Sequence, residues 1–124
     1  MRTPSRASAS VSPTANPDAI SCRFAEEAER DIEELYHIIA SRDGAEAAER
    51  ILTEIESTCA ELEEFPVRGN VPKELAGIGI SEYRELHHKP WRMIYRILAT
   101  DVVVYCVVDG RRDMQAFLER RLLR

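Results

Sequence analysis

The amino-acid sequence predicts an α+β fold in which an antiparallel helix hairpin packs on one face of a small antiparallel sheet. Three observations indicate this class. Apolar residues recur at helical spacing through residues 25–65. Runs rich in β-branched and aromatic residues follow between residues 80 and 108. Residues 114–122 then return to helical spacing. With 124 residues and 44% hydrophobic side chains, the chain suffices for one globular domain with a modest core.

The start of the chain differs in composition from the rest. Residues 1–18 are rich in Ser, Thr and Pro and show no hydrophobic period, so we predict a disordered leader there. The domain is predicted to span residues 19–124 and to begin with a short strand at residues 19–24. The leader lacks the apolar segment of a secretory signal, and no run approaches the roughly 18 apolar residues that span a bilayer. We therefore expect a cytoplasmic protein that does not associate with membranes.

Two helices are predicted after the first strand, separated by a break at residues 41–44. Asp43, followed three residues later by Glu46, predicts a capping box at the start of the second helix. So short a connection predicts an antiparallel hairpin. The apolar faces are predicted to be Ala28, Ile32, Leu35 and Ile39 in the first helix, and Ala48, Ile51, Ile55, Cys59 and Leu62 in the second.

Three strands are predicted in the second half, at residues 80–88, 91–98 and 102–108. A turn-rich connection precedes them, in which Lys73 to Leu75 form one helical turn after Pro72. In the second of these strands, alternation places Arg92 and Arg96 on the same face. The last of the three is apolar on both faces, which predicts an interior position. Its two faces are predicted to hold Val102, Val104, Cys106 and Val108 against Val103, Tyr105 and Val107.

A last helix is predicted to follow Asp113, whose side chain suits an N-cap. The residues that recur at helical spacing are Met114, Phe117, Leu118, Arg121 and Leu122.

The three cysteines are Cys22, Cys59 and Cys106. Their number is odd, no Cys-x-x-Cys pair is present, and no histidine lies at zinc-ligand spacing. Each lies within an apolar pattern, so we interpret all three as buried free thiols. We expect no metal site and no cofactor.

Charge is distributed unevenly along the chain. Residues 1–65 carry 6 basic and 15 acidic side chains, whereas residues 66–124 carry 11 basic and 7 acidic. The acidic outer faces of the two helices are interpreted as solvated surface. The basic second half indicates an anionic partner, either nucleic acid or an acidic protein.

From residue 19 onward the chain resembles the RelE/ParE superfamily of small bacterial toxins. The motifs that carry the resemblance are Phe24 to Ile32, Phe65-Pro66 with Gly69, Pro72 to Leu75, Tyr83 to Leu86, Trp91 to Ile97, and Gly110 to Asp113. None is specific alone, but their order and spacing are typical of the superfamily, and the last resembles its ParE side. The resemblance implies a toxin of a type II toxin-antitoxin system, such as those that stabilise plasmids. Such a toxin is neutralised by a cognate antitoxin, and it contacts operator DNA only through that antitoxin.

One branch of this superfamily cleaves messenger RNA on the ribosome without a metal. The resemblance implies that it uses two lysines on the second strand, an arginine opening the third, an arginine after the fourth and a tyrosine in the last helix. Arg92 and Arg112 match the two arginines, and Arg84 stands where one lysine is expected. The second lysine is missing, and Leu118 occupies the tyrosine position. The catalytic candidates are therefore Arg84, Arg92 and Arg112.

Two histidines are further candidates for the missing proton carriers. His87 and His88 fill that role only if the end of their strand turns into the concave face of the sheet.

The other branch poisons DNA gyrase and needs only shape and positive charge at its binding surface. We favour this branch because the groups that RNA cleavage needs are missing. The residues predicted to bind the target are Arg84, Arg92, Arg96, Arg111 and Arg112. Two alternatives remain open, a RelE-like ribosome-dependent endonuclease and an inactive toxin fold that only binds a partner. Arg92 and Arg112 are expected to be exposed, so that replacing either with alanine leaves the fold intact.

Overall fold

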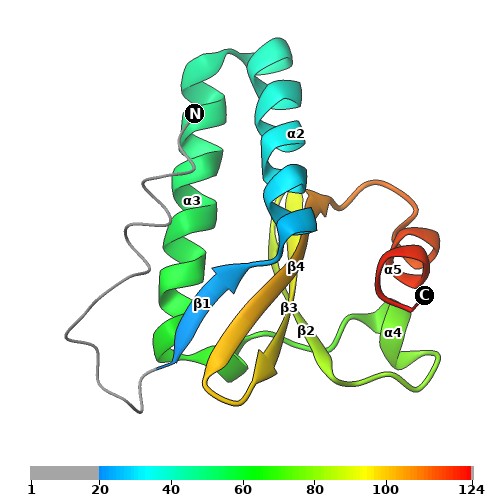
Figure 1. Ribbon diagram of the computed structural model, residues 1–124. Helices are drawn as coiled ribbons and strands as arrows, with labels where there is room; N and C mark the ends of the chain where they lie inside the picture. Colours follow the sequence, from blue (N-terminus) through cyan, green and yellow to red (C-terminus); the bar gives the residue numbers. More distant parts are fainter. Residues whose placement is uncertain (1–19, 124) are drawn as a thin grey trace.

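The computed structural model describes residues 20–123 and has the predicted α+β class (Figure 1). The leader predicted at residues 1–18 lies outside the described residues. The elements are β1 (Ser21–Phe24), α2 (Glu26–Asp43), α3 (Ala45–Glu64), the 3-10 turn η1 (Pro66–Arg68), α4 (Lys73–Ala76), β2 (Tyr83–His88), β3 (Trp91–Leu98), β4 (Asp101–Asp109) and α5 (Met114–Leu122). The first strand begins two residues later than predicted, and β2 begins three residues later.

Four strands form one sheet in the order β1-β4-β3-β2. β2, β3 and β4 are antiparallel neighbours, as the sequence predicts, and β1 pairs with β4 in parallel. β4 is thus an interior strand with a neighbour on each side, which confirms the interpretation of its two apolar faces.

The helix hairpin of α2 and α3 packs on one face of the sheet and extends beyond its end (Figure 1). The apolar faces predicted for the two helices are buried, except that Ile51 is half-buried and Leu52 is buried beside it. The predicted capping box is wrong. Asp43 still belongs to α2, and α3 has no side-chain cap. The chain turns at Gly44 instead, where φ is 100°, a conformation that glycine adopts with little strain.

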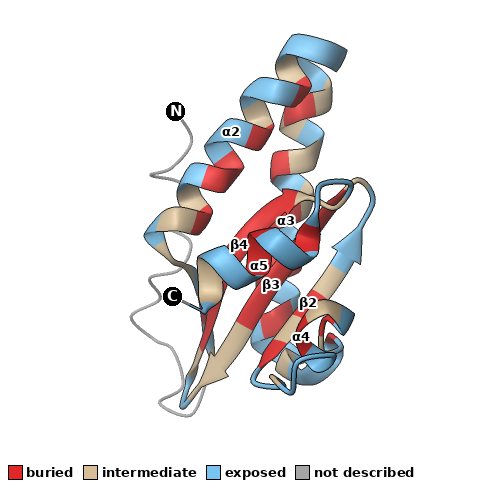
Figure 2. Ribbon diagram, turned by 90° about the vertical axis from the view of Figure 1, so that its right-hand side faces the viewer, coloured by how far each residue is buried: buried red, intermediate tan, exposed pale blue. Residues whose placement is uncertain are grey.

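The opposite face of the sheet is covered by two shorter helices, α4 and α5. Figure 2 shows α5 lying across the buried strands β3 and β4. The predicted cap is confirmed, because the Asp113 carboxylate accepts a hydrogen bond from the Ala116 backbone N–H at 3.1 Å. The second core formed on this face consists of Leu75, Tyr83, Ile94, Cys106, Val108, Met114, Phe117 and Leu118.

A β-bulge in β4 changes the faces predicted for that strand. Ile94 is opposite Cys106, but the next residue, Tyr95, is opposite Val104, so Tyr105 is the extra residue. The bulge reverses the alternation after it. Val107 therefore joins the core under the helix hairpin, whereas Cys106 joins the core under α5. Strict alternation predicted that Cys106, and not Val107, would share a face with Val102 and Val104.

Polar groups at the bulge are bound by side chains from both helical layers. The Asp31 carboxylate on α2 accepts a hydrogen bond from the Val107 N–H at 3.1 Å. Arg121 on α5 donates to the Tyr105 carbonyl at 3.0 Å and to Asp31 at 2.9 Å. Asp31 is 7% exposed, and this cluster ties α2, β4 and α5 together.

The interpretation of all three cysteines as free thiols is wrong for two of them. Cys22 on β1 and Cys59 on α3 form a disulfide, whereas Cys106 is free and buried as predicted. Burial raises the pKa of the Cys106 thiol to about 12. Periodicity identified each cysteine as buried, but it carries no information about the distance between residues 37 positions apart.

Within residues 20–123, no helix is both long and apolar enough to cross a bilayer.

Candidate functional site

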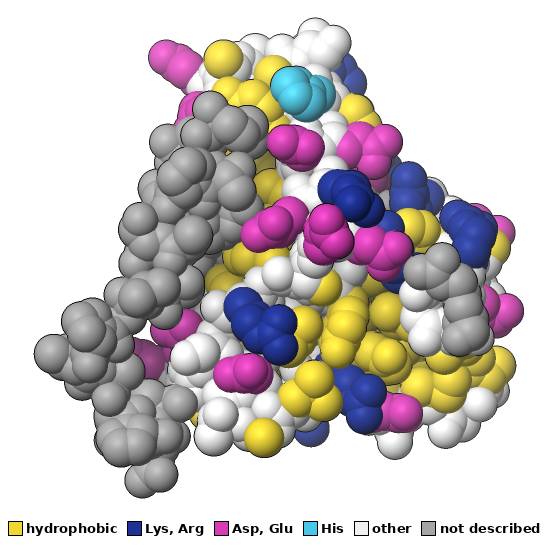
Figure 3. Space-filling model, in the orientation of Figure 1, with side chains coloured by type: hydrophobic (Ala, Val, Ile, Leu, Met, Phe, Trp, Pro, Cys, Tyr) yellow, Lys and Arg dark blue, Asp and Glu magenta, His cyan; other side chains and the backbone are white. Residues whose placement is uncertain are grey.

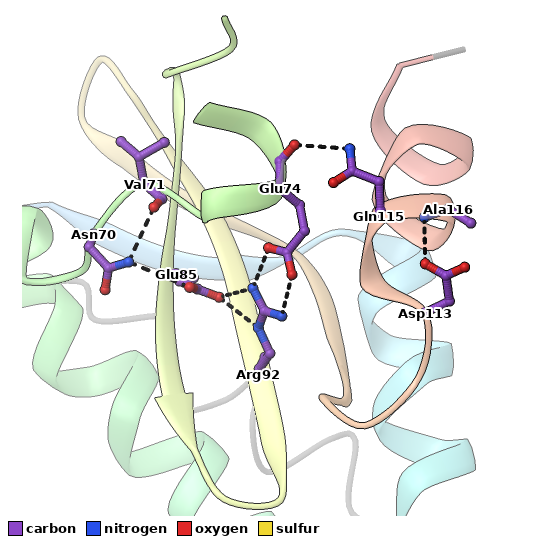
Figure 4. A network of polar contacts seen from close by, with 8 residues as sticks. All are labelled: Asn70, Val71, Glu74, Glu85, Arg92, Asp113, Gln115 and Ala116. Carbon is purple, nitrogen blue, oxygen red and sulfur yellow. Dashed lines mark hydrogen bonds and ion pairs between the residues drawn. The ribbon is translucent and has the colours of Figure 1, made fainter. Parts of the chain in front are cut away.

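Arg92 lies at the centre of the candidate site, and the structure corrects its predicted exposure. It projects from β3 toward the α4 side of the sheet and is only 4% exposed. Its Nε donates to Glu85 Oε1 at 2.7 Å. Its Nη1 and Nη2 donate to the two carboxylate oxygens of Glu74, at 3.0 and 2.9 Å (Figure 4). The guanidinium is therefore held by a carboxylate from α4 and another from β2.

These interactions fix the charges of the cluster. The hydrogen bonds from Arg92 lower the pKa of Glu74, and those bonds in turn raise the pKa of Arg92. Both groups are ionised at neutral pH. Two carboxylates share one guanidinium, so removal of Arg92 leaves the buried Glu85 and the partly buried Glu74 without their cation.

The backbone around the cluster is fitted closely to the side chains. A Cβ added at Gly110 would lie 2.8 Å from Cδ of Arg92, so any residue other than glycine would crowd the Arg92 side chain. Asn70 pairs with Glu85 through both backbone groups, at 2.7 and 3.2 Å. Its side-chain amide also donates to Glu85 Oε2 at 3.4 Å. The segment before α4 is thereby attached to β2 where Glu85 reaches Arg92.

A hollow of about 410 Å³ opens beside Arg92, between α4, the start of α5 and the sheet. Among residues 20–123, three of its cationic or titratable lining side chains, Lys73, His87 and Arg112, have no salt bridge and donate no side-chain hydrogen bond. All three are exposed, and the Arg112 guanidinium lies 4.7 Å from the Phe117 ring centroid. The full lining is Asn70, Val71, Lys73, Glu74, Glu85, His87, Arg92, Gly110, Arg112 and Met114.

The hollow brings together only two of the five arginines predicted from the sequence, Arg92 and Arg112. Arg84 donates to the carbonyls of Val67 and Gly69 at 3.2 and 2.6 Å, and strand alternation places it on the face opposite Glu85. The remaining two arginines are also engaged outside the hollow.

Arg96 and Arg111 each have a local partner. The Arg96 guanidinium lies 5.7 Å from the ring centroid of Tyr83. Arg111 is exposed and forms an ion pair with Asp109 at 2.6 Å. Arg111 is two residues from its partner, so this pair holds the turn after β4 and leaves the guanidinium accessible.

The two histidines differ in position. His87 lines the hollow, whereas the ring of His88 stacks on Trp91 with centroids 4.9 Å apart. His88 also lies 3.6 Å from Glu54 on α3. Leu118, at the position where the sequence lacks a tyrosine, is fully buried in the second core.

Sequence reasoning missed the two acidic residues of the cluster. The contact between Glu85 and Arg92 could have been inferred from the sequence. The turn at Lys89-Pro90 sets a register in which Glu85 is diagonal to Arg92 across β2 and β3. Glu74 gave no such signal. Its contact depends on where the four-residue helix α4 crosses the sheet, which neither period nor spacing specifies.

Comparisons with known proteins agree on one group of relatives. The family model described as ParE toxin of type II toxin-antitoxin system, parDE, matches residues 22–114. Toxin ParE3 of Caulobacter vibrioides is 29% identical over 91 residues, which are 73% of this chain and 87% of that protein.

Two solved structures share the fold. A chromosomal ParDE toxin-antitoxin system from P. aeruginosa matches with a TM-score of 0.62 at 15% identity, over 74% of this chain and 97% of that one. The RelBE2 toxin-antitoxin complex from Mycobacterium tuberculosis matches with a TM-score of 0.55 at 22% identity, over 73% of this chain and 98% of that one. At these identities the likeness concerns the fold.

Proposed function

We propose that this chain, which belongs to the ParE toxin family of type II toxin-antitoxin systems, inhibits growth by binding and poisoning DNA gyrase. The observation that carries the choice of target is the occupation of Arg92 by Glu74 and Glu85. A toxin that acts by binding alone tolerates such an arrangement, whereas a nuclease needs its cations at the scissile phosphate.

The energetics of the cluster argue against Arg92 as a catalytic residue. To reach an RNA phosphate, its guanidinium would have to leave one or both carboxylates in a buried position. Breaking a buried ion pair costs about 3–5 kcal/mol. This cost would fall on every turnover, so the cluster supports a structural role for Arg92.

The missing proton carriers support the same choice. Leu118 has no ionisable group and is fully buried. Arg84 donates to two backbone carbonyls on the other face of the sheet. One observation favours the RelE-like alternative, which is that His87 and Arg112 line the same hollow. A metal-independent ribosome-dependent endoribonuclease is therefore the second candidate.

The arginines differ in what they offer a target. Arg111 and Arg112 are exposed at the turn after β4, and we assign them as the main gyrase contacts. Arg84 and Arg96 are half-buried and engaged with partners at the other end of β2 and β3, so we assign them no main role in binding the target. Arg92 contributes by fixing the position of α4.

We further propose a cognate antitoxin as the neutralising partner. Figure 3 shows acidic side chains gathered over the helix hairpin and an apolar area over the sheet, bordered by basic side chains. An amphipathic helix of the antitoxin would cover the apolar area, with its acidic residues against the arginines. The two structural relatives are themselves toxin-antitoxin systems. Operator DNA would be reached only through the antitoxin, and both proteins would act in the cytoplasm.

The test is induced expression in bacteria with two readouts. The proposal predicts gyrase-dependent DNA breaks and an SOS response, while 5′-end mapping finds ribosome-bound messages intact. Rapid cleavage of messages in the decoding site, without DNA breaks, would establish the nuclease alternative. A folded protein that leaves growth unaffected would instead indicate an inactive binding module.

A further inference from the structure

We propose that Cys22 and Cys59, the cysteine pair, form a reversible redox switch. In the disulfide form the pair fixes the edge strand β1 on α3, and in the dithiol form β1 is free to open. The biological setting rests on the proposed function, because a protein that acts on gyrase works in the cytoplasm, but no step involves gyrase itself. The observations are the location of the cysteine pair, the short length of β1 and the packing that keeps the two residues opposite each other.

The cysteine pair joins the edge of the sheet to the helix hairpin. Cys22 lies on β1 and Cys59 on α3, 37 positions later in the sequence. β1 has four residues and lies at the edge of the sheet, where it pairs with β4 (Figure 1). The disulfide is therefore a covalent link between an edge strand and the helix beside it.

Noncovalent contacts hold β1 over a short length. Its backbone pairs with β4 through residues Ser21 to Phe24. Toward α3, the Glu63 carboxylate accepts a hydrogen bond from the Cys22 N–H at 2.8 Å. The apolar side chains of Ile20 and Phe24 are only half-buried. A short edge strand at the start of a domain belongs to the part of a fold that opens at the lowest free energy.

The position of α3 does not depend on the disulfide. Ile55 and Leu62, on either side of Cys59 along the helix, are 1% and 0% exposed in the core under the hairpin. The register of β1 on β4 places Cys22 independently. The Cα atoms of the cysteine pair lie 5.8 Å apart, within the range of about 4.4–6.8 Å that a disulfide bridges. A reduced pair therefore stays within reach and can close again.

The cytoplasm makes a reversible bond the expected one. Thiols in that compartment are kept reduced by glutathione and thioredoxin, and the disulfides found there are usually redox-sensing or catalytic. Cys22 and Cys59 are 4% and 7% exposed, so a small thiol reaches their sulfur atoms when β1 opens. The opening of β1 therefore controls how fast the cysteine pair responds.

Glutathione disulfide is the oxidant that closes the switch. One cysteine thiolate attacks a sulfur of glutathione disulfide, the S–S bond of that molecule breaks, and one glutathione leaves as a thiolate. The second cysteine thiolate then attacks the protein sulfur of the mixed disulfide, and the second glutathione leaves. The cysteine pair loses two electrons and two protons, and the two glutathione thiolates take up the protons. Reduced glutathione reverses both steps.

The two forms differ in how β1 opens. In the dithiol form, opening breaks noncovalent contacts alone, whereas the disulfide keeps Cys22 against α3. The disulfide form should therefore resist proteolysis at the start of the domain, where a protease needs the chain to open locally. The switch would make the lifetime of the toxin longer in a cell under oxidative stress.

The first test equilibrates the purified full chain in glutathione buffers that range from the poise of the cytosol to that of the endoplasmic reticulum. Alkylation in denaturant, followed by mass spectrometry, counts the free thiols. Cys106 is free in both forms, so we expect three free thiols at the cytosolic poise and one at the oxidising poise. Cys106→Ala is the matched control and should keep this transition. A cysteine pair that stays oxidised, or stays reduced, over the whole range would overturn the proposal.

The second test compares amide hydrogen exchange in the two forms. The N–H groups of Ser21 and Ala25 donate to the carbonyls of Thr100 and Val104, so their exchange reports the opening of β1. We expect it to be about tenfold or more slower in the disulfide form. The Glu85 N–H, at the opposite edge of the sheet, should change far less. Equal exchange of Ser21 and Ala25 in the two forms would contradict the proposal.

A variant separates the switch from a general loss of stability. Glu63→Gln weakens the noncovalent contact between α3 and Cys22, so it should speed exchange at Ser21 and Ala25 in the dithiol form and much less in the disulfide form. Glu64→Gln, at the exposed neighbouring residue, is the matched control and should change neither form. Equal acceleration by Glu63→Gln in both forms would show that the disulfide does not fix β1. These readouts use neither gyrase nor growth, so they hold even if the proposed target is wrong.

Discussion

The face of the sheet under α2 and α3 and the face under α4 and α5 are held together by different chemistry. The first is apolar apart from Asp31 and Thr58, and it carries the disulfide between Cys22 and Cys59. The second has a smaller apolar core and buries the ion cluster of Arg92. The helices explain the difference, since α2 and α3 have 18 and 20 residues but α4 has only 4.

The second face is the one where a functional site is expected. The four-residue helix α4 buries too little apolar surface to be fixed on the sheet by packing alone. The ion pair between Glu74 and Arg92 positions it. The same charges leave a polar hollow and exposed cations around them. The hairpin face buries one charged side chain, Asp31, which is bound to Arg121, and the rest of its core is almost entirely apolar.

Replacing Arg92 with alanine should break the second face and have the largest effect. The buried Glu85 and the partly buried Glu74 would lose their cation, so we expect a loss of about 3–5 kcal/mol in the free energy of unfolding. Urea denaturation measures this loss. Arg96→Ala is the control, and its contact with the Tyr83 ring contributes about 0.5–1 kcal/mol. Equal effects of the two substitutions would show that the cluster does not hold this face.

Reducing the disulfide tests the hairpin face. The bond joins residues 37 positions apart, and such a link typically contributes about 2–4 kcal/mol. We expect the denaturation midpoint of the wild type to fall when dithiothreitol is added. The double variant Cys22→Ala, Cys59→Ala should show no response to the reductant. A wild-type midpoint that is the same with and without reductant contradicts this account.

Glu74→Gln should weaken the second face by less, and its effect should depend on pH. Loss of the charged hydrogen bonds costs about 1.5–3 kcal/mol at pH 7. Arg92 holds the pKa of Glu74 below its ordinary value of 4.5, so the carboxylate stabilises the fold above that value. The contribution is lost as the pH falls through the lowered pKa. The stability difference between wild type and variant should therefore shrink in acid, and a constant difference would refute the assignment.

Arg112→Ala should have the smallest effect on stability. Its side chain is exposed and, within residues 20–123, has no ion pair, so only its contact with the Phe117 ring, worth about 0.5–1 kcal/mol, should be lost. Thermal unfolding beside the wild type measures it. A large loss of stability would place Arg112 with Arg92 as a structural residue.

The sequence predicted the elements well and the polar contacts poorly. Helix faces such as Ala28 to Ile39 follow from period alone, and the interior position of β4 follows from its two apolar faces. Period cannot reveal an extra residue such as Tyr105, because a bulge changes the register without changing residue type. Nor can it measure the distance between Cys22 and Cys59.

The same limit applies to the candidate site. Arg92 and Arg112 looked equivalent in sequence, because both are arginines at positions that match the superfamily. The structure distinguishes them, because α4 places Glu74 against Arg92 and leaves Arg112 exposed. The identity of a residue at a position therefore indicated where a candidate site lies but not which of its arginines is exposed.

The most direct test of the proposed function is gyrase-dependent DNA cleavage by purified wild-type protein, Arg112→Ala and Arg50→Ala. Arg50 is an exposed arginine on α3, remote in sequence from the turn after β4, and serves as the matched control. The proposal predicts that the wild type and Arg50→Ala accumulate cleaved DNA with gyrase, whereas Arg112→Ala, which remains folded at the assay temperature, accumulates much less. No cleaved DNA with the folded wild-type protein, or full activity of Arg112→Ala, would contradict it.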